Sequence, residues 1–114
     1  MVTPAAGTVV LVPFPFSDLS QSKLRPALVL AEAGRGDWIL CQITSNPYGD
    51  TKAIEIKDDS LEAGSLRVTS FARPGKLFTA NDSLIINQVG TLKAEKFTQI
   101  IGAVIGILQR SLIP

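Results

Sequence analysis

Arg25 is the residue of this sequence best suited to carry chemistry, because its neighbours fix where it lies. It stands before Pro26 and the apolar run Ala27-Leu28-Val29-Leu30, which predicts a buried strand. Pro26 has a fixed φ and biases the residue before it toward extended geometry, so Arg25 should lie at the mouth of that strand. A guanidinium offers a planar fork of donors that suits phosphate or carboxylate. The segment therefore favours a site for an anionic substrate, although an arginine before a strand is more often a solvated surface residue.

The residues before Arg25 predict a polar loop that could close over it. The loop begins at Phe14-Pro15-Phe16-Ser17-Asp18 and contains little for a core to bury. Phe14 and Phe16 could anchor its base or, where exposed, stack on a nucleobase. Asp18 is the one acidic residue of the loop, and so the one carboxylate that it offers as a general base.

Composition excludes several kinds of site. The 114 residues are 46% hydrophobic with a net charge of +1, which fits one globular domain, 1–114, without a bulk basic field. There is no histidine, the usual general base, and no metal-ligand spacing of cysteines and carboxylates. The single cysteine, Cys41, cannot form an internal disulfide and fits a reducing compartment. We expect no membrane span and no secretory signal, because no apolar run has the required length or flanks.

Short apolar and alternating runs predict five to seven strands. We expect strands at residues 7–12, 25–32, 38–44, 53–56, 66–71 and within 84–89. Gly34-Arg35-Gly36-Asp37 predicts the turn of a hairpin. Pro13 should end the first strand, Pro15 should keep the loop from pairing, and Pro74-Gly75 should bend the chain. Residues 58–64 should form a turn region.

The C-terminal segment predicts an amphipathic helix that faces the sheet. Its apolar stripe consists of Phe97, Ile100, Ile101, Val104, Ile105 and Leu108. Gly102 and Gly106 should weaken the helix by about 1 kcal/mol each relative to alanine. We interpret them as allowing a neighbouring backbone to approach closely, within the domain or across a dimer. Together these elements indicate a mainly β domain with a small, strongly bent sheet, open or closed into a barrel.

Four motifs resemble the MazF/PemK family of toxin ribonucleases from type II toxin–antitoxin systems. They are Gly7-Thr8-Val9-Val10, Phe14-Pro15-Phe16-Ser17-Asp18, Lys23-x-Arg25-Pro26-Ala27-Leu28-Val29-Leu30 and Cys41-Gln42-Ile43-Thr44-Ser45. The likeness runs in order over nearly the whole chain and is most specific in its first 45 residues. It implies an SH3-like barrel of the CcdB/MazF type with a C-terminal helix, a homodimer and a bacterial cytoplasmic location.

The resemblance also implies a reaction: cofactor-free, metal-independent, sequence-selective cleavage of single-stranded RNA, the activity of an mRNA interferase. It assigns catalysis to Arg25, which would stabilise charge on the phosphate, and to Thr44, which would add a hydroxyl donor. The proton transfers stay open, because Ser20 stands where some family members place a glutamate. Either Asp18 takes that role, or Arg25 moves protons in a water-poor site, or cleavage is slow. General acid–base catalysis contributes about 10²–10⁴ in rate.

Further residues are expected to contact phosphates or base edges: Phe16, Ser17, Lys23, Ser45, Asn46, Ser70, Arg73 and Lys76. The segment from Ser70 to Lys76 corresponds to the part of the family that lines the RNA groove. The resemblance implies a cognate antitoxin that covers Arg25 with acidic groups, and DNA binding only through that antitoxin.

Two alternatives remain open. One is a gyrase poison of the CcdB kind, although that group ends in Trp-Gly-Ile and this chain in Leu112-Ile113-Pro114. The other is a catalytically inactive RNA-binding domain.

Overall fold

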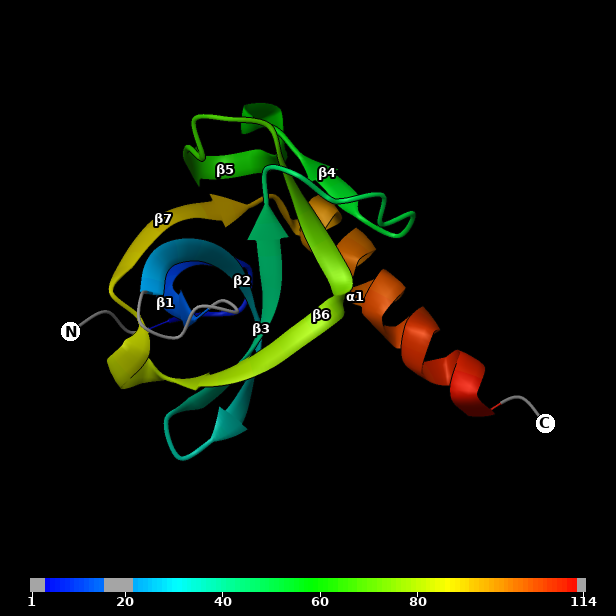
Figure 1. Ribbon diagram of the computed structural model, residues 1–114, viewed down its shortest axis with the longest axis horizontal. Helices are drawn as coiled ribbons and strands as arrows, with labels where there is room; N and C mark the ends of the chain where they lie inside the picture. Colours follow the sequence, from blue (N-terminus) through cyan, green and yellow to red (C-terminus); the bar gives the residue numbers. More distant parts are fainter. Residues whose placement is uncertain (1–3, 16–21, 113–114) are drawn as a thin grey trace.

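Seven antiparallel strands curl into a nearly closed barrel with one α-helix beside it (Figure 1). The computed structural model describes residues 4–15 and 22–112. The strand order is β4-β6-β3-β2-β1-β7-β5. The strands are β1 (Thr8–Pro15), β2 (Ser22–Gly34), β3 (Asp37–Thr44), β4 (Ile54–Ile56), β5 (Leu61–Gly64), β6 (Ser70–Asn81) and β7 (Asn87–Leu92). The helix is α1 (Ala94–Gln109), and the short 3₁₀ helices are η1 (Asp58–Ser60), η2 (Asp82–Leu84) and η3 (Arg110–Leu112). The prediction of a small, mainly β barrel with a C-terminal helix is confirmed.

The two edge strands, β4 and β5, lie close in the chain and are joined through η1. The Lys93 amide, which precedes α1, donates a hydrogen bond to the Ser60 carbonyl at 2.9 Å. The end of the barrel is therefore tied to the start of the helix. In the described part of the chain, no helix has the length and apolar character needed to cross a membrane.

β1 and β2 pair further than their prolines suggest. The ladder continues to Pro15 opposite Ser22. The predicted end of the first strand at Pro13, the predicted start of the second strand and the expectation that Pro15 prevents pairing are therefore wrong. The Leu11 carbonyl accepts a hydrogen bond from the Ile86 amide on the side of β1 away from β2. In antiparallel pairing the nitrogens of Pro13 and Pro15 point to that same side. The paired part of β7 does not reach them, so neither proline removes a ladder hydrogen bond.

The predicted hairpin between the second and third strands is confirmed. Gly34 pairs with Asp37 around a two-residue loop. Arg35 and Gly36 have φ values of 57° and 80°, as a type I′ turn requires. The turn is held further by the Asn81 amide, which donates to the Asp37 carboxylate at 3.1 Å. The hairpin therefore sets the pairing of β2 with β3 next to the turn.

Pro74-Gly75 interrupts pairing without ending a strand. β6 runs unbroken from Ser70 to Asn81, but Cys41 pairs with Leu77 while Ile43 pairs with Ala72. The additional residues of β6 form a bulge that contains the proline and the glycine, so the predicted bend takes this form.

Residues 58–71 differ most from the sequence prediction. The expected turn region contains β5 as well as η1, and the expected strand at 66–71 begins only at Ser70. Arg67 has a φ of 69°, which is incompatible with an extended strand. The short strand predicted at 53–56 is present as β4, whereas the one predicted within 84–89 lies at 87–92 because η2 occupies residues 82–84.

Alternating residues of the strands supply two buried clusters. One packs between the sheet and α1 and includes Val9, Leu28 and Ile43 with Ile100 and Val104 of the helix. The other lies on the opposite face of the same strands and consists of Val10, Val12, Ala27, Val29, Leu40, Ala80 and Ile85, with Trp38 and Phe78 packed against it. Between the register shifts of these strands, this period of two fixes the face on which each side chain lies.

Only the first part of the helical stripe is covered. Ile100 and Val104 are buried, whereas Ile105 and Leu108 are 46% and 61% exposed. Figure 1 shows the last turns of α1 extending past the barrel. The expectation that the whole stripe faces the sheet is therefore wrong for its C-terminal end. Nothing lies within 4 Å of a Cβ placed at Gly102 or Gly106, so neither glycine serves a close approach within the domain.

We predict that Gly102→Ala raises the free energy of unfolding by about 1 kcal/mol, because alanine favours the helix and its methyl group meets no neighbour. Gly64→Ala should lower the same free energy by more than about 1 kcal/mol. Gly64 has a φ of 83°, and a Cβ there would overlap the Val89 carbonyl oxygen. Urea unfolding at several protein concentrations measures both effects. A destabilised Gly102→Ala whose loss depends on concentration would contradict the prediction and place Gly102 in an interface between two copies.

Candidate active site

Arg25 and Thr44 lie on neighbouring strands, β2 and β3. The pairing of these strands ends at Ala27 opposite Gln42, and Arg25 and Thr44 each lie two residues beyond that pair. Residues two apart along a strand share a face, so both side chains lie on the same face as Ala27 and Gln42. Both line one cavity of about 470 Å³. The structure therefore brings together the two residues that the sequence predicts as a catalytic pair.

The lining of this cavity suits an anion. It contains two guanidinium groups, several hydroxyls and one amide, with no carboxylate among the described residues: Leu11, Arg25, Pro26, Ile43, Thr44, Ser45, Ser65, Leu66, Arg67, Val68, Ser70, Asn87 and Val89. The formal charge of the whole chain is +1, so two positive charges in one cavity are a local concentration. In the part of the chain that the structure describes, no group of three His, Cys, Asp or Glu side chains could hold a metal ion.

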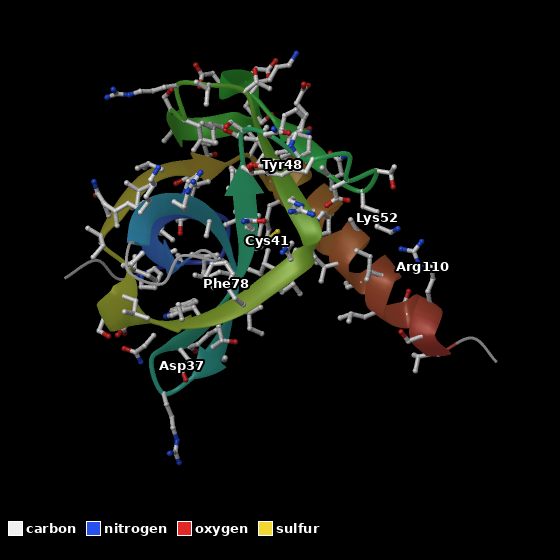
Figure 2. All side chains as sticks on the ribbon, viewed as in Figure 1. Asp37, Cys41, Tyr48, Lys52, Phe78 and Arg110 are labelled. Carbon is white, nitrogen blue, oxygen red and sulfur yellow. The ribbon has the colours of Figure 1, made fainter. Side chains whose placement is uncertain are left out.

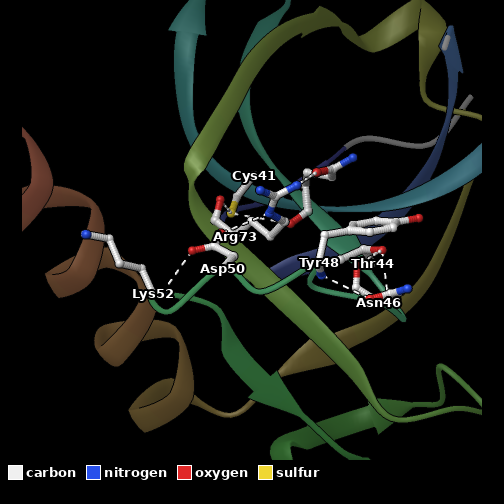
Figure 3. Close-up of polar contacts among 8 residues, drawn as sticks. Cys41, Thr44, Asn46, Tyr48, Asp50, Lys52 and Arg73 are labelled. Atoms are coloured by element: carbon white, nitrogen blue, oxygen red, sulfur yellow. Dashed lines mark hydrogen bonds and ion pairs between the residues drawn. The ribbon is translucent and has the colours of Figure 1, made fainter. Parts of the chain in front are cut away.

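The Thr44 hydroxyl also shapes the loop that follows β3 (Figure 3). It accepts a hydrogen bond from the Asn46 amide and donates one to the Asn46 carbonyl, each at 3.1 Å. The Asn46 side-chain oxygen accepts from the Tyr48 amide at 3.0 Å. To donate to a ligand, the Thr44 O–H must turn away from the Asn46 carbonyl. A phosphate oxygen favours that exchange, because a charged acceptor forms the stronger hydrogen bond.

Arg73 anchors the other end of this loop. Its Nε donates to Asp50 Oδ2 at 2.9 Å, and its Nη1 lies 3.4 Å from Gln42 Oε1. The Asp50 side chain also accepts from the Lys52 amide at 2.9 Å, and the Arg73 carbonyl accepts from the Cys41 thiol at 3.1 Å (Figure 3). The side chains of Arg73 and Asp50 are only 20% and 17% exposed, so this ion pair is partly shielded from water.

Two pKa values at this network are shifted in opposite directions, for different reasons. The hydrogen bond from Arg73 lowers the pKa of Asp50 below its ordinary value of 3.8, with help from the Lys52 amide. Burial raises the pKa of Cys41 to about 12. Cys41 is therefore a neutral thiol at physiological pH, and we assign it no nucleophilic role.

The other predicted site residues divide into four groups. Ser45 and Ser70 line the cavity. Asn46 is exposed beside it, and Lys23 is exposed on β2 two residues before Arg25, hence on the same face. Arg73 and Lys76 are not among its described lining residues; Lys76 is exposed on β6. Phe16, Ser17 and Asp18 lie outside the described residues.

Sequence reasoning missed three polar residues of the cavity, Ser65, Arg67 and Asn87. Alternation across 66–71 suggested a strand and gave no sign that Arg67 would reach the same site as Arg25. The sequence also gave no sign that Tyr48 would be exposed. Its side chain, on the loop after β3, is 76% exposed (Figure 2). These residues come from segments far apart in sequence, so no local spacing could have identified them.

We predict that Asp50→Asn destabilises the fold at pH 7 by about 1–3 kcal/mol, because it leaves the partly buried Arg73 without its counter-ion. Since folding lowers the Asp50 pKa, the ion pair stabilises the native state above about pH 4 and is lost as pH falls through the lower folded value. The difference between wild type and variant, measured by urea unfolding, should therefore shrink below pH 4. Glu55→Gln is the matched control, since its pair with Lys57 is half exposed and should change stability by less than about 1 kcal/mol. A constant difference from pH 7 to pH 3 would contradict the assignment.

Solved structures with the same fold include several toxins. A MazE–MazF complex (Form-II) from Deinococcus radiodurans matches with a TM-score of 0.74 and 21% identity, covering 96% of this chain and 98% of that chain. An endoribonuclease in complex with its cognate antitoxin from a mycobacterial species gives 0.72 and 12%, with 96% of each chain covered. The Mycobacterium tuberculosis toxin MazF-mt6 gives 0.65 and 17%, with 88% of this chain and 96% of that chain covered. At these identities the likeness shows the fold.

The family is shown by a sequence comparison. No curated protein matches the chain significantly. A family model described as "PemK-like, MazF-like toxin of type II toxin-antitoxin system" matches residues 5–108, which include the cavity and all seven strands. The chain therefore belongs to the PemK-like, MazF-like toxin family of type II toxin–antitoxin systems.

Proposed function

We propose that this protein is a metal-independent endoribonuclease toxin that cuts single-stranded RNA in the cavity between β2 and β3. The observation that carries the proposal is that Arg25 and Thr44, on neighbouring strands, line one cavity together with a second guanidinium group and several hydroxyls. Such a lining binds an anion. Membership of a toxin family that includes endoribonucleases makes the RNA backbone the expected anion.

The reaction is a transesterification within the RNA chain. The 2′-oxygen of one ribose bonds to the adjacent phosphorus, and the bond from phosphorus to the 5′-oxygen of the next nucleotide breaks. The 2′-hydroxyl loses its proton to a base, and the leaving 5′-oxygen gains a proton. Negative charge develops on the non-bridging oxygens of the phosphorane, where fixed donors contribute most.

Arg25 and Thr44 supply those donors. Arg25 presents a planar, permanently charged fork to the non-bridging oxygens. Thr44 adds its hydroxyl when it exchanges the Asn46 carbonyl for a phosphate oxygen. Removing one such donor costs roughly 10²–10³ in rate in other enzymes. Proton transfer is assigned to Asp18 as the candidate base, because an arginine with a pKa above about 12 is a poor base at neutral pH.

A splayed single strand fits this site best. Attack in line with the leaving oxygen needs a flexible backbone, and recognition of RNA sequence mostly uses unpaired bases. Ser45, Asn46 and Ser70 present hydroxyl and amide groups that can read base edges. We assign sequence selectivity to these residues, and backbone attraction to Lys23 beside Arg25.

Regulation follows from the same charges. A cognate antitoxin with acidic groups would cover Arg25 and exclude RNA, and any contact with DNA would come through that antitoxin. Two of the similar structures are toxin–antitoxin complexes by name. A second copy of this chain would cover the exposed leucines and isoleucine at the end of α1, which gives a homodimer. We place the pair in the bacterial cytoplasm.

One observation favours a second function, RNA binding without cleavage. Arg25, Arg67 and Thr44 offer donors that can bind RNA phosphates, whereas the described lining residues include no carboxylate or histidine to act as a base. Cleavage by the purified protein distinguishes the two functions.

We predict that the purified protein cuts single-stranded RNA in the presence of EDTA, and that Arg25→Ala lowers the rate by at least about 10²-fold. The fold should persist, because Arg25 is only part-buried at the strand mouth. Arg35→Ala is the matched control: Arg35 lies in the hairpin turn and should leave cleavage unchanged. Product analysis by gel and mass spectrometry should show 2′,3′-cyclic phosphate ends. Undiminished cleavage by Arg25→Ala would rule out this site.

We also predict that Thr44→Val lowers the cleavage rate by about 10²-fold, whereas Thr44→Ser retains most of it. Valine keeps the shape and β-branching of threonine but removes both the donor and the Asn46 contact. Rates at saturating RNA, together with thermal unfolding, separate catalysis from stability. Equal rates for the valine and serine variants would remove Thr44 from the mechanism.

A further inference from the structure

Arg67 is the second guanidinium of the cavity, and the proposed reaction assigns it no role. It comes from the segment between β5 and β6, whereas Arg25 and Thr44 come from β2 and β3. Its side chain is exposed. Two separate segments of the barrel therefore each bring one permanent positive charge to the same cavity.

The backbone at Arg67 is held in a conformation that arginine rarely adopts. Its φ is 69°, in the left-handed region that favours glycine. Two hydrogen bonds maintain it: the Arg67 amide donates to Ser65 Oγ at 2.9 Å, and the Ser65 hydroxyl donates to Asp58 Oδ1 at 3.0 Å. Non-glycine residues held in this way are often found at functional sites. The arrangement fixes where the Arg67 side chain leaves the backbone.

The charge on Arg67 is also uncompensated within the described residues. Arg73 forms an ion pair with Asp50, whereas no described carboxylate lies within ion-pair distance of the Arg67 guanidinium. The nearby Asp58 carboxylate is bound to the Ser65 hydroxyl. Arg67 is therefore available to an external anion, and the described lining residues of the cavity include no carboxylate.

We propose that Arg67 binds a second backbone phosphate of the RNA strand whose scissile phosphate lies at Arg25. This inference rests on the proposed function and extends it to a residue without an assigned role. A cavity of about 470 Å³ lies in the range of about 300–1,000 Å³ typical of ligand sites, so it can enclose more than one phosphate group. Two guanidinium groups on one strand would fix its register and hold the ribose between them against Thr44.

The salt dependence of binding tests this directly. The probe is a fluorescein-labelled, random-sequence single strand with 2′-O-methyl ribose throughout, which lacks the attacking hydroxyl and cannot be cut. Its affinity is measured by anisotropy between about 50 and 200 mM KCl for the wild type, Arg67→Ala and Arg67→Lys. Arg35→Ala is the matched control, because Arg35 is also exposed and also has a left-handed backbone, with a φ of 57°.

Arg67→Ala should weaken binding about tenfold at the lower salt concentration. It should also reduce the slope of log affinity against log salt by about 0.7, the amount expected for one phosphate of a single strand. Arg67→Lys should restore the slope, and Arg35→Ala should match the wild type. With cleavable RNA, the substitution should raise KM more than it lowers kcat. Thermal unfolding of each variant confirms that the fold is retained.

Three outcomes overturn the inference. An Arg67→Ala slope equal to that of Arg35→Ala, with RNA cleavage by the wild type intact, refutes the Arg67 contact and leaves the proposed function standing. Weaker binding of a polyglutamate peptide with unchanged oligonucleotide binding would assign Arg67 to an acidic protein segment instead. A wild type that neither binds the oligonucleotide nor cuts RNA would refute the proposed function, and this inference with it.

Discussion

The pairing of β2 with β3 is the constraint on which the candidate site depends. Near the hairpin turn Gly34 pairs with Asp37, a register that would carry Arg25 opposite Asn46. Two register shifts within β2 change this alignment by two residues, and the register of Ala27 with Gln42, if continued, brings Arg25 level with Thr44. A shift of two keeps every side chain on its original face, whereas a slip of one would move Arg25 to the opposite face. The buried residues on both faces of these strands prevent such a slip.

The loop after β3 is held at both ends by polar groups. At its start the Thr44 hydroxyl binds Asn46, and at its end Asp50 binds Arg73. The contact between Thr44 and Asn46 is weak, because it joins neutral groups that are exposed to water. The contact between Asp50 and Arg73 is an ion pair that is partly shielded from water. The loop can therefore release the Thr44 hydroxyl to a ligand while Asp50 and Arg73 keep it in place.

Local placement of charge explains how a chain with a net charge of +1 can present an anion site. Arg73 is neutralised by Asp50, and Lys57 lies near Glu55. Arg25 and Arg67 both line one cavity, and its described lining residues include no carboxylate. The attraction is consequently short in range and specific to one cavity, which suits recognition of a few phosphates better than wide electrostatic steering.

The sequence by itself determined the features that depend on neighbouring residues: the Gly34–Asp37 turn, the helical stripe from Phe97, and the position of Arg25 before Pro26. Through family motifs it also predicted Arg25 and Thr44 as site residues, and the two line one cavity. Tertiary structure alone decided the rest. Pairing up to Pro15 depends on how far β7 extends beside β1, and the engagement of Arg73 depends on where the loop after β3 places Asp50. Arg67 reaches the cavity because the barrel brings the chain between β5 and β6 against β2 and β3. Such contacts join distant segments, and no local periodicity encodes them.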